Sequence, residues 1–124
     1  MPERKHKFLG ILMVELEDLR SDIMELVAKM AEERESQKIS SYTYRENVVA
    51  LENEINGIKA AEAELGTISE DSRPDLDSLI VLINERLEQV FKKKAINRAA
   101  YVIIQRKVQK VKGYVTKDLA PGKG

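Results

Sequence analysis

The sequence predicts an all-α protein, a bundle of long antiparallel coiled-coil helices. Large apolar residues recur at alternating spacings of three and four along most of the chain, which is the heptad pattern of packed helices. Residues that end or begin helices gather in two short stretches, and no segment has the pattern of a strand. The length of 124 residues suits one domain, which we expect to span residues 1–117 before a flexible tail at 118–124.

The first helix is expected over residues 3–37. Its heptad positions all carry large apolar side chains, namely Leu9, Leu12, Leu16, Leu19, Ile23, Leu26 and Met30. We expect the first six of these side chains to form the core. Phe8, Met13 and Val27 lie beside this row and widen the apolar face, which indicates that more than one helix packs against it.

The second helix is expected over residues 44–65. Thr43 and Glu46 before and within its first turn have the spacing of a capping box, in which each side chain accepts a hydrogen bond from a free amide. Gly57 lies inside this helix, where the missing side chain would let another helix approach closely. Gly66 follows the last apolar residue and is expected to end the helix in the left-handed conformation.

The last helix is expected to begin at Pro74, since Pro is favoured in the first turn of a helix. From Leu76 onward, ten of twelve heptad positions are apolar, and neither Gly nor Pro occurs before Gly113. The favoured interpretation is a single helix from 74 to 112, about 58 Å long at 1.5 Å per residue.

Two polar residues interrupt this last apolar row. Lys94 and Asn97 occupy heptad positions that are otherwise filled by apolar side chains. They indicate either a locally exposed turn of a continuous helix or a break near Lys92–Asn97. A break would divide the segment and give four helices instead of three.

The expected lengths leave apolar segments uncovered, because the second helix is much shorter than its neighbours. Residues 8–14 and 99–115 would extend beyond it, and contiguous apolar surface normally marks an interface. Either the last helix breaks and folds back, or a second subunit covers these segments, and the unbroken heptad spacing favours the second subunit. The candidate self-association surface consists of Phe8, Leu9, Leu12, Tyr101, Ile104, Val108 and Val111.

The net charge is zero, but the charges are segregated along the chain. Residues 92–117 carry nine basic side chains and no acidic one, whereas residues 15–35 and 46–88 are predominantly acidic. The favoured interpretation is that the basic segment packs beside acidic helices of its own bundle or of a partner subunit. The alternative is a nucleic-acid-associated protein that binds phosphates. Its candidate anion-binding residues are Lys92, Lys93, Lys94, Arg98, Arg106, Lys107 and Lys110.

The composition excludes several kinds of chemistry. Without Cys the chain has no disulfide, thiolate metal site or cysteine nucleophile, and its single His cannot supply a pair of imidazole ligands. We identify no catalytic, cofactor-binding or metal-binding residue and no enzymatic motif. No uncharged stretch is long enough to span a bilayer, and the absence of Cys is compatible with the cytoplasm, where we expect the protein.

The sequence therefore predicts a non-enzymatic, oligomeric helical-bundle module for protein–protein interaction. Its expected partners are a second copy of the chain, in a homodimer or a higher oligomer, and a further protein that the residues do not identify. No cofactor is expected. Nucleic acid is the disfavoured alternative partner, recognised through the basic C-terminal helix.

Overall fold

The computed structural model describes residues 2–118. Within them the chain forms four α-helices, α1 (Pro2–Glu35), α2 (Ser41–Leu65), α3 (Leu76–Lys93) and α4 (Arg98–Asp118), with a 3₁₀ turn η1 (Glu70–Ser72) between α2 and α3. No strand occurs in residues 2–118, and the prediction of an all-α helical bundle is confirmed. The expected tail at 118–124 lies outside the described residues except for its first residue, which ends α4.

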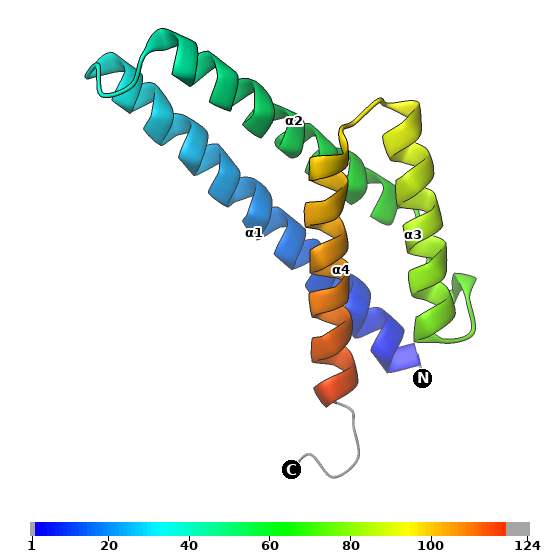
Figure 1. Ribbon diagram of the computed structural model, residues 1–124. Coiled ribbons are helices and arrows are strands. Elements are labelled where there is room, and N and C mark those ends of the chain that lie inside the picture. Colours follow the sequence, from blue (N-terminus) through cyan, green and yellow to red (C-terminus); the bar gives the residue numbers. More distant parts are fainter. Residues whose placement is uncertain (1, 119–124) are drawn as a thin grey trace.

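The favoured prediction of one last helix from 74 to 112 is wrong, and the alternative of a break near Lys92–Asn97 is correct. Residues 94–97 separate α3 from α4, and α4 folds back beside α3 (Figure 1). The helix also does not stop at Gly113, which lies within α4. The chain therefore brings its C-terminal apolar segment back onto α1 and covers it without a second subunit.

A left-handed residue makes the turn between α3 and α4. The amides of Ala95 and Ile96 donate to carbonyls in the last turn of α3, at 3.3 and 3.0 Å, which is the hydrogen-bond pattern of a Schellman motif. Ala95 has a φ of 53°, a conformation that costs an L-residue about 1–2 kcal/mol. Asn97 then caps α4, because its Oδ1 accepts a hydrogen bond from the amide of Ala100 at 3.1 Å.

The ends of α2 and the start of α3 differ from those that the sequence predicts. α2 begins three residues earlier than expected, because the hydroxyl of Ser40 accepts from the amide of Thr43 at 3.0 Å and Ser40 is the cap. Gly66 ends α2 with a φ of −63°, so it is not left-handed. α3 begins at Leu76 and not at Pro74, because its cap is Asp75, whose carboxylate accepts from the amide of Ser78 at 2.8 Å in a capping box.

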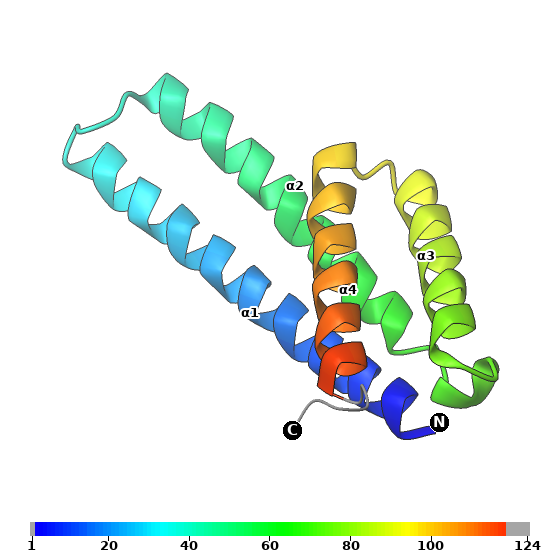
Figure 2. The same ribbon diagram turned by 60° about the horizontal axis from the view of Figure 1, so that its bottom comes forward.

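α3 and α4 pack on only one end of the hairpin that α1 and α2 form (Figures 1 and 2). We call this four-helix part, residues 2–23 and 57–118, the body. The core of the protein lies there, because side chains from all four helices meet in it. The largest fully buried side chains are Phe8, Leu12, Leu16, Ile58, Leu79, Ile83, Leu87, Ile104, Val108, Val111 and Val115.

α4 approaches α2 closely at Gly57. A Cβ atom added to Gly57 would lie 2.8 Å from the Cβ of Ala100 and 3.1 Å from the side chain of Ile96. Carbon atoms in favourable contact are about 3.5–4.0 Å apart, so a residue with a side chain does not fit here without a shift of α4. The prediction that Gly57 permits a close helix approach is confirmed.

Replacing Gly57 with Ala should therefore lower the free energy of unfolding, by about 1–3 kcal/mol, because the added methyl overpacks the contact with α4. Gly10→Ala is a matched control, since Gly10 is also helical but no heavy atom lies within 4 Å of an added Cβ. That change should raise the free energy of unfolding by about 1 kcal/mol through helix propensity. Urea unfolding followed by circular dichroism measures both, and equal stabilisation by the two changes would contradict the close approach.

Candidate interaction surfaces

Most of the candidate self-association surface lies in the core of the chain itself. The fully buried members are Phe8, Leu12, Ile104, Val108 and Val111. Leu9 and Tyr101 are half-buried and pack against the same core. The break between α3 and α4 is the physical reason, since it lets α4 cover the N-terminal half of α1. These five buried side chains therefore offer no surface to a partner in this conformation.

The uncovered apolar surface lies instead on the part of the α1–α2 hairpin that extends beyond the body. We call residues 24–56 the arm, which projects from the body in Figure 1. Not one residue of the arm is buried, although its two helices carry apolar residues at heptad positions. Two helices alone leave the flanks of their shared apolar stripe open, because a stripe of this width needs a further element to cover it.

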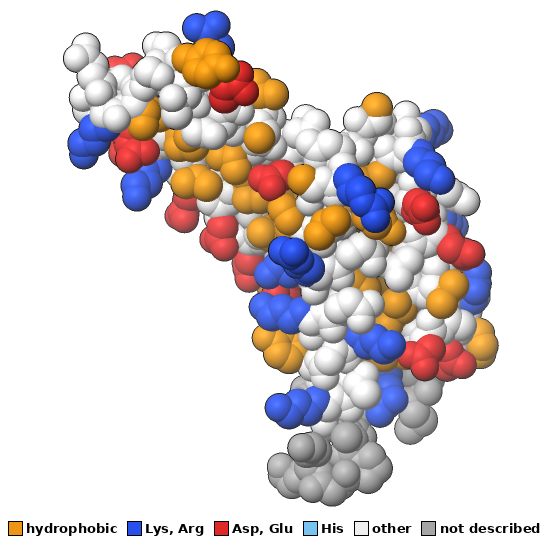
Figure 3. All heavy atoms as spheres, in the orientation of Figure 1, with side chains coloured by type: hydrophobic (Ala, Val, Ile, Leu, Met, Phe, Trp, Pro, Cys, Tyr) orange, Lys and Arg blue, Asp and Glu red, His pale blue; other side chains and the backbone are white. Residues whose placement is uncertain are grey.

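Four large apolar side chains of the arm are strongly exposed, namely Met24 (48%), Leu26 (45%), Tyr42 (73%) and Val49 (66%). Leu26 belongs to the apolar row that we expected in the core, and this expectation is wrong because no third helix covers the row there. In Figure 3, hydrophobic side chains follow the line between α1 and α2 along the arm. The exposed apolar side chains lie on more than one face of the arm, since Met24 and Leu26 are two residues apart and point in nearly opposite directions from α1.

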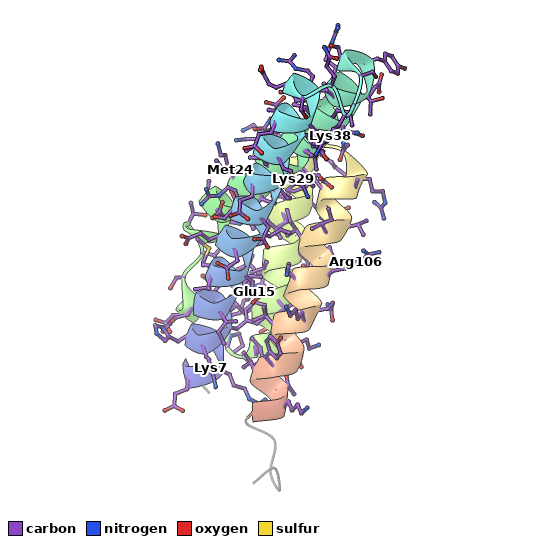
Figure 4. The ribbon with its side chains drawn as sticks, turned by 90° about the vertical axis from the view of Figure 1, so that its left-hand side faces the viewer. Lys7, Glu15, Met24, Lys29, Lys38 and Arg106 are labelled. Carbon is purple, nitrogen blue, oxygen red and sulfur yellow. The ribbon has the colours of Figure 1, made fainter. Side chains whose placement is uncertain are left out.

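A shallow groove of about 460 Å³ lies between α1 and α2 at the inner end of the arm. Its lining residues are Met24, Val27, Glu52, Ile55, Asn56 and Lys59. Figure 4 shows Met24 on the side of α1 that is turned away from α4, so the groove is on the face that the body leaves free. Three of the lining residues are apolar and three are polar or charged, and a mixed composition of this kind is common in protein interfaces.

Local contacts tie the two helices of the arm together at both ends. At the tip, the guanidinium of Arg34 lies 4.6 Å from the centroid of the Tyr44 ring, and Gln37 ends the turn after α1 in the left-handed conformation with a φ of 62°. Just inside the body, next to the inner end of the arm, Arg20 donates two hydrogen bonds to the carboxylate of Glu62, at 2.8 and 3.3 Å. A surface that is ordered before binding loses less entropy when a partner docks.

The basic C-terminal segment is partly neutralised within the chain. Lys107 and Lys110 of α4 both donate to Oε1 of Glu15 in α1, at 3.2 and 3.0 Å. The hydrogen bond from Lys110 is the main reason that the pKa of Glu15 lies below its ordinary value, and Lys107 adds to this effect against the opposing desolvation. Figure 4 shows Glu15 on α1 beside α4. This part of the segment therefore packs on an acidic residue of its own bundle.

Only some of the candidate anion-binding residues are free of acidic partners. Lys92 pairs with Glu88 at 3.7 Å, so that Lys92, Lys107 and Lys110 all have a carboxylate nearby. The other four candidates form no ion pair with a described residue, namely Lys93, Lys94, Arg98 and Arg106. Arg106 points away from α1 in Figure 4 and lies about 12 Å along α4 from Arg98. Lys93 ends α3 and Lys94 lies in the turn after it, so these four cations are distributed over two helices and their connection.

Residues 2–118 contain neither a candidate metal site nor a candidate membrane-spanning helix. No three His, Asp or Glu side chains come together there to form a group that could hold a metal ion. His6 has an exposed side chain and shares a hydrogen bond with Glu70 at 2.8 Å. None of the described helices combines the length and the apolar character that a membrane crossing requires.

The ion pairs of Glu15 with Lys107 and Lys110 should make the stability of the fold depend on pH in acid. Because the folded state lowers the pKa of Glu15 below 4.5, the pair stabilises the fold fully above about pH 4.5, and this stabilisation is lost as the pH falls through the lower, folded pKa. Glu15→Gln should lower the free energy of unfolding at neutral pH by about 1 kcal/mol, since the pair is only partly exposed. Glu25→Gln is the control, since Glu25 is exposed and makes no ion pair with a described residue. Equal stability of the two variants at pH 7 in urea unfolding would contradict the proposed role of Glu15.

The spread of the basic side chains predicts weak binding to nucleic acid. We expect a dissociation constant above roughly 10 μM at physiological salt, the range of non-specific phosphate contacts. Fluorescence anisotropy with duplex DNA and single-stranded RNA at two salt concentrations measures it. Submicromolar, steeply salt-dependent binding that is lost in the Lys93→Glu, Lys94→Glu double variant would establish the basic surface as a nucleic-acid site instead.

Comparison with known proteins gives no match. No known protein family fits the chain, and no curated protein or solved structure is significantly similar to it. The function is therefore inferred from the geometry described above.

Proposed function

We propose that the protein is a non-enzymatic, oligomeric helical module for protein–protein interaction, and that it self-associates through the arm. The observation that carries this proposal is the arm itself, which contains no buried residue and exposes Met24 and Leu26 by nearly half. Full burial of such a side chain stabilises by roughly 1.5–3 kcal/mol, and a half-exposed residue forgoes about half of this. Large apolar side chains exposed on a stiff, projecting hairpin are typical of an interface.

The arm has the form of one half of a coiled-coil four-helix bundle. In such a bundle each helix packs against two neighbours, whereas each helix of the arm has one. A second arm, related by a two-fold axis, would supply the missing neighbours, and the groove between Met24 and Ile55 would face its own copy. A second copy is therefore the occupant that we propose for this groove.

The charges of the arm favour an antiparallel arrangement of the two copies. Its four cations all lie in the outer half, between residues 29 and 47, namely Lys29, Arg34, Lys38 and Arg45. The outer half also carries four carboxylates, Glu32, Glu33, Glu35 and Glu46, so its net charge is zero, whereas the inner end of the arm, residues 24–28 and 48–56, carries three carboxylates and no cation. Antiparallel packing places the neutral outer half of one arm on the acidic inner end of the other, which keeps the two acidic ends apart and brings the four cations near carboxylates of the other copy. We expect this assembly in the cytoplasm, with which the lack of Cys is compatible.

Met24→Glu tests the proposal, because it places a carboxylate at an apolar position of the groove without touching the body core. The dissociation constant of the dimer should rise at least roughly tenfold, since burying an unpaired charge there is strongly unfavourable. Sedimentation equilibrium measures the mass of the native chain and of the variant against the 14.1 kDa of one chain.

Val81→Glu is the matched control for this experiment. Val81 is exposed to a similar extent (51%) but lies on α3, far along the chain from the arm, so its change should leave the dissociation constant unaltered. A native chain that remains a 14.1 kDa species at every concentration would overturn self-association through the arm. The groove would then be a binding site for a different protein.

A further inference from the structure

We propose that two copies of the chain can exchange α4, so that the α4 helix of each copy docks on the α1–α2 hairpin of the other. Exchange requires residues 94–97 to straighten and join α3 and α4 into one helix. The occupant of the surface beneath α4 would then be the same helix from a second copy. This proposal concerns the body and goes beyond the arm, on which it does not depend.

The first argument is that α4 is held mainly by α1 and α2. Its Ile104, Val108 and Val111 are fully buried against the body core, and its Lys110 donates to Glu15 of α1 at 3.0 Å. At its N-terminal end, Ala100 packs on Gly57 of α2. A hairpin can make each of these contacts equally well with the α4 of a second copy, since the two helices are chemically identical.

The contacts between α3 and α4 would also be restored in the exchanged dimer. Gln105 donates to Oδ1 of Asn84 at 2.9 Å, and the rings of Tyr101 and Phe91 meet edge to face with centroids 5.5 Å apart. When the α4 of one copy docks on the other body, it lies beside the α3 of that body. The closed and exchanged forms therefore differ only in the four residues that connect the helices.

The second argument is that this connection is short and unfavourable. Ala95 has a φ of 53°, a left-handed conformation that glycine adopts freely and an L-residue does not. The connection, Lys94-Ala-Ile-Asn97, contains neither Gly nor Pro, and its Lys and Ala are good helix formers. In a straight helix Ala95 would return to its preferred conformation. A short hinge that carries strain favours exchange between copies.

The third argument comes from the heptad spacing, which continues through the connection. Leu87 and Val90 of α3 lead at spacings of four and three through Lys94 and Asn97 to Tyr101 of α4. A continuous helix over residues 76–118, about 65 Å long, would therefore keep its apolar side chains along one face. No residue of the connection prevents the helix from passing through it.

A few identifiable contacts hold the closed form. Asn97 caps α4 through the amide of Ala100 at 3.1 Å, and the amide of Asn97 itself donates to Oδ1 of Asn53 at 3.4 Å. Ile96 is half-buried beside Gly57. These contacts favour the turn, whereas the backbone of Ala95 opposes it. Changes at residues 95 and 97 should therefore shift the equilibrium in opposite directions.

The first test compares Ala95→Gly with Asn97→Ala in a Met24→Glu background, which removes association through the arm. The chains are unfolded, refolded at high concentration and analysed by sedimentation velocity. Ala95→Gly favours the turn and disfavours a continuous helix, so with two hinges per dimer the dimer dissociation constant should rise about a hundredfold. Asn97→Ala removes the cap and should lower this constant about tenfold or more. An Asn97→Ala chain that stays monomeric would overturn the proposal.

The second test identifies which chain supplies α4. Unlabelled and ¹⁵N-labelled native chains are unfolded together and refolded, and the dimer is treated with a carbodiimide, which joins an amine directly to a neighbouring carboxylate. In an exchanged dimer the Lys110–Glu15 link connects chains of different label, because these residues lie on α4 and α1. The Lys92–Glu88 link within α3 is the internal control and must stay within one chain.

The outcomes separate this proposal from the one for the arm. Mixed-label Lys110–Glu15 peptides support exchange of α4 whatever the effect of Met24→Glu. A dimer in which every Lys110–Glu15 link lies within one chain overturns the exchange and leaves association through the arm intact.

Discussion

Docking of α4 on the α1–α2 hairpin is the contact on which the rest of the structure depends. Four aliphatic side chains of α4, Ile104, Val108, Val111 and Val115, are fully buried, and each such burial stabilises the fold by roughly 1.5–3 kcal/mol. The chain reverses direction after α3 to make this contact and accepts the left-handed Ala95, at about 1–2 kcal/mol, because the burial outweighs it. The position of the body, the uncovered arm and the pairing of the basic segment all follow from that reversal.

The sequence predicts the helices well and their break poorly, for a reason that lies in the heptad pattern. From Leu87 the apolar row continues either three residues on, to Val90, or four residues on, to Phe91. The structure buries Phe91 (5% exposed) and leaves Val90 half-buried. The row through Phe91 reaches only Lys94 and Ala95, where the apolar character ends. The usual sequence signal for the end of a helix is a glycine in the left-handed position. Here that position holds Ala95, a good helix former, so this residue gives no sign that the helix ends.

The heptad pattern alone does not reveal that the apolar residues of the arm are exposed. Leu12 and Leu26 occupy the same heptad position two heptads apart, yet Leu12 is fully buried and Leu26 is 45% exposed. What distinguishes them is the length of the helices that cover α1. α3 and α4, with 18 and 21 residues, are about 27 and 32 Å long, whereas α1, with 34 residues, is about 51 Å long. Once the break is known, helix length alone leaves the outer part of the hairpin uncovered.

Basic residues of α4 lie beside an acidic residue of α1. These charges fix the register of α4 on the hairpin more than they stabilise the fold. An apolar row with a repeat of three and four would let α4 slide by one turn along the hairpin and still bury aliphatic side chains. Two contacts exclude such a slide, since Lys107 and Lys110 meet on Glu15, and Ala100 needs the space above Gly57. Partly exposed ion pairs contribute little free energy, but a shifted register would leave the Glu15 carboxylate without its partners and drive Ala100 against a larger residue. The same two contacts would select the correct register for an α4 helix from either chain, because they depend on the helix and the hairpin and not on the connection between them.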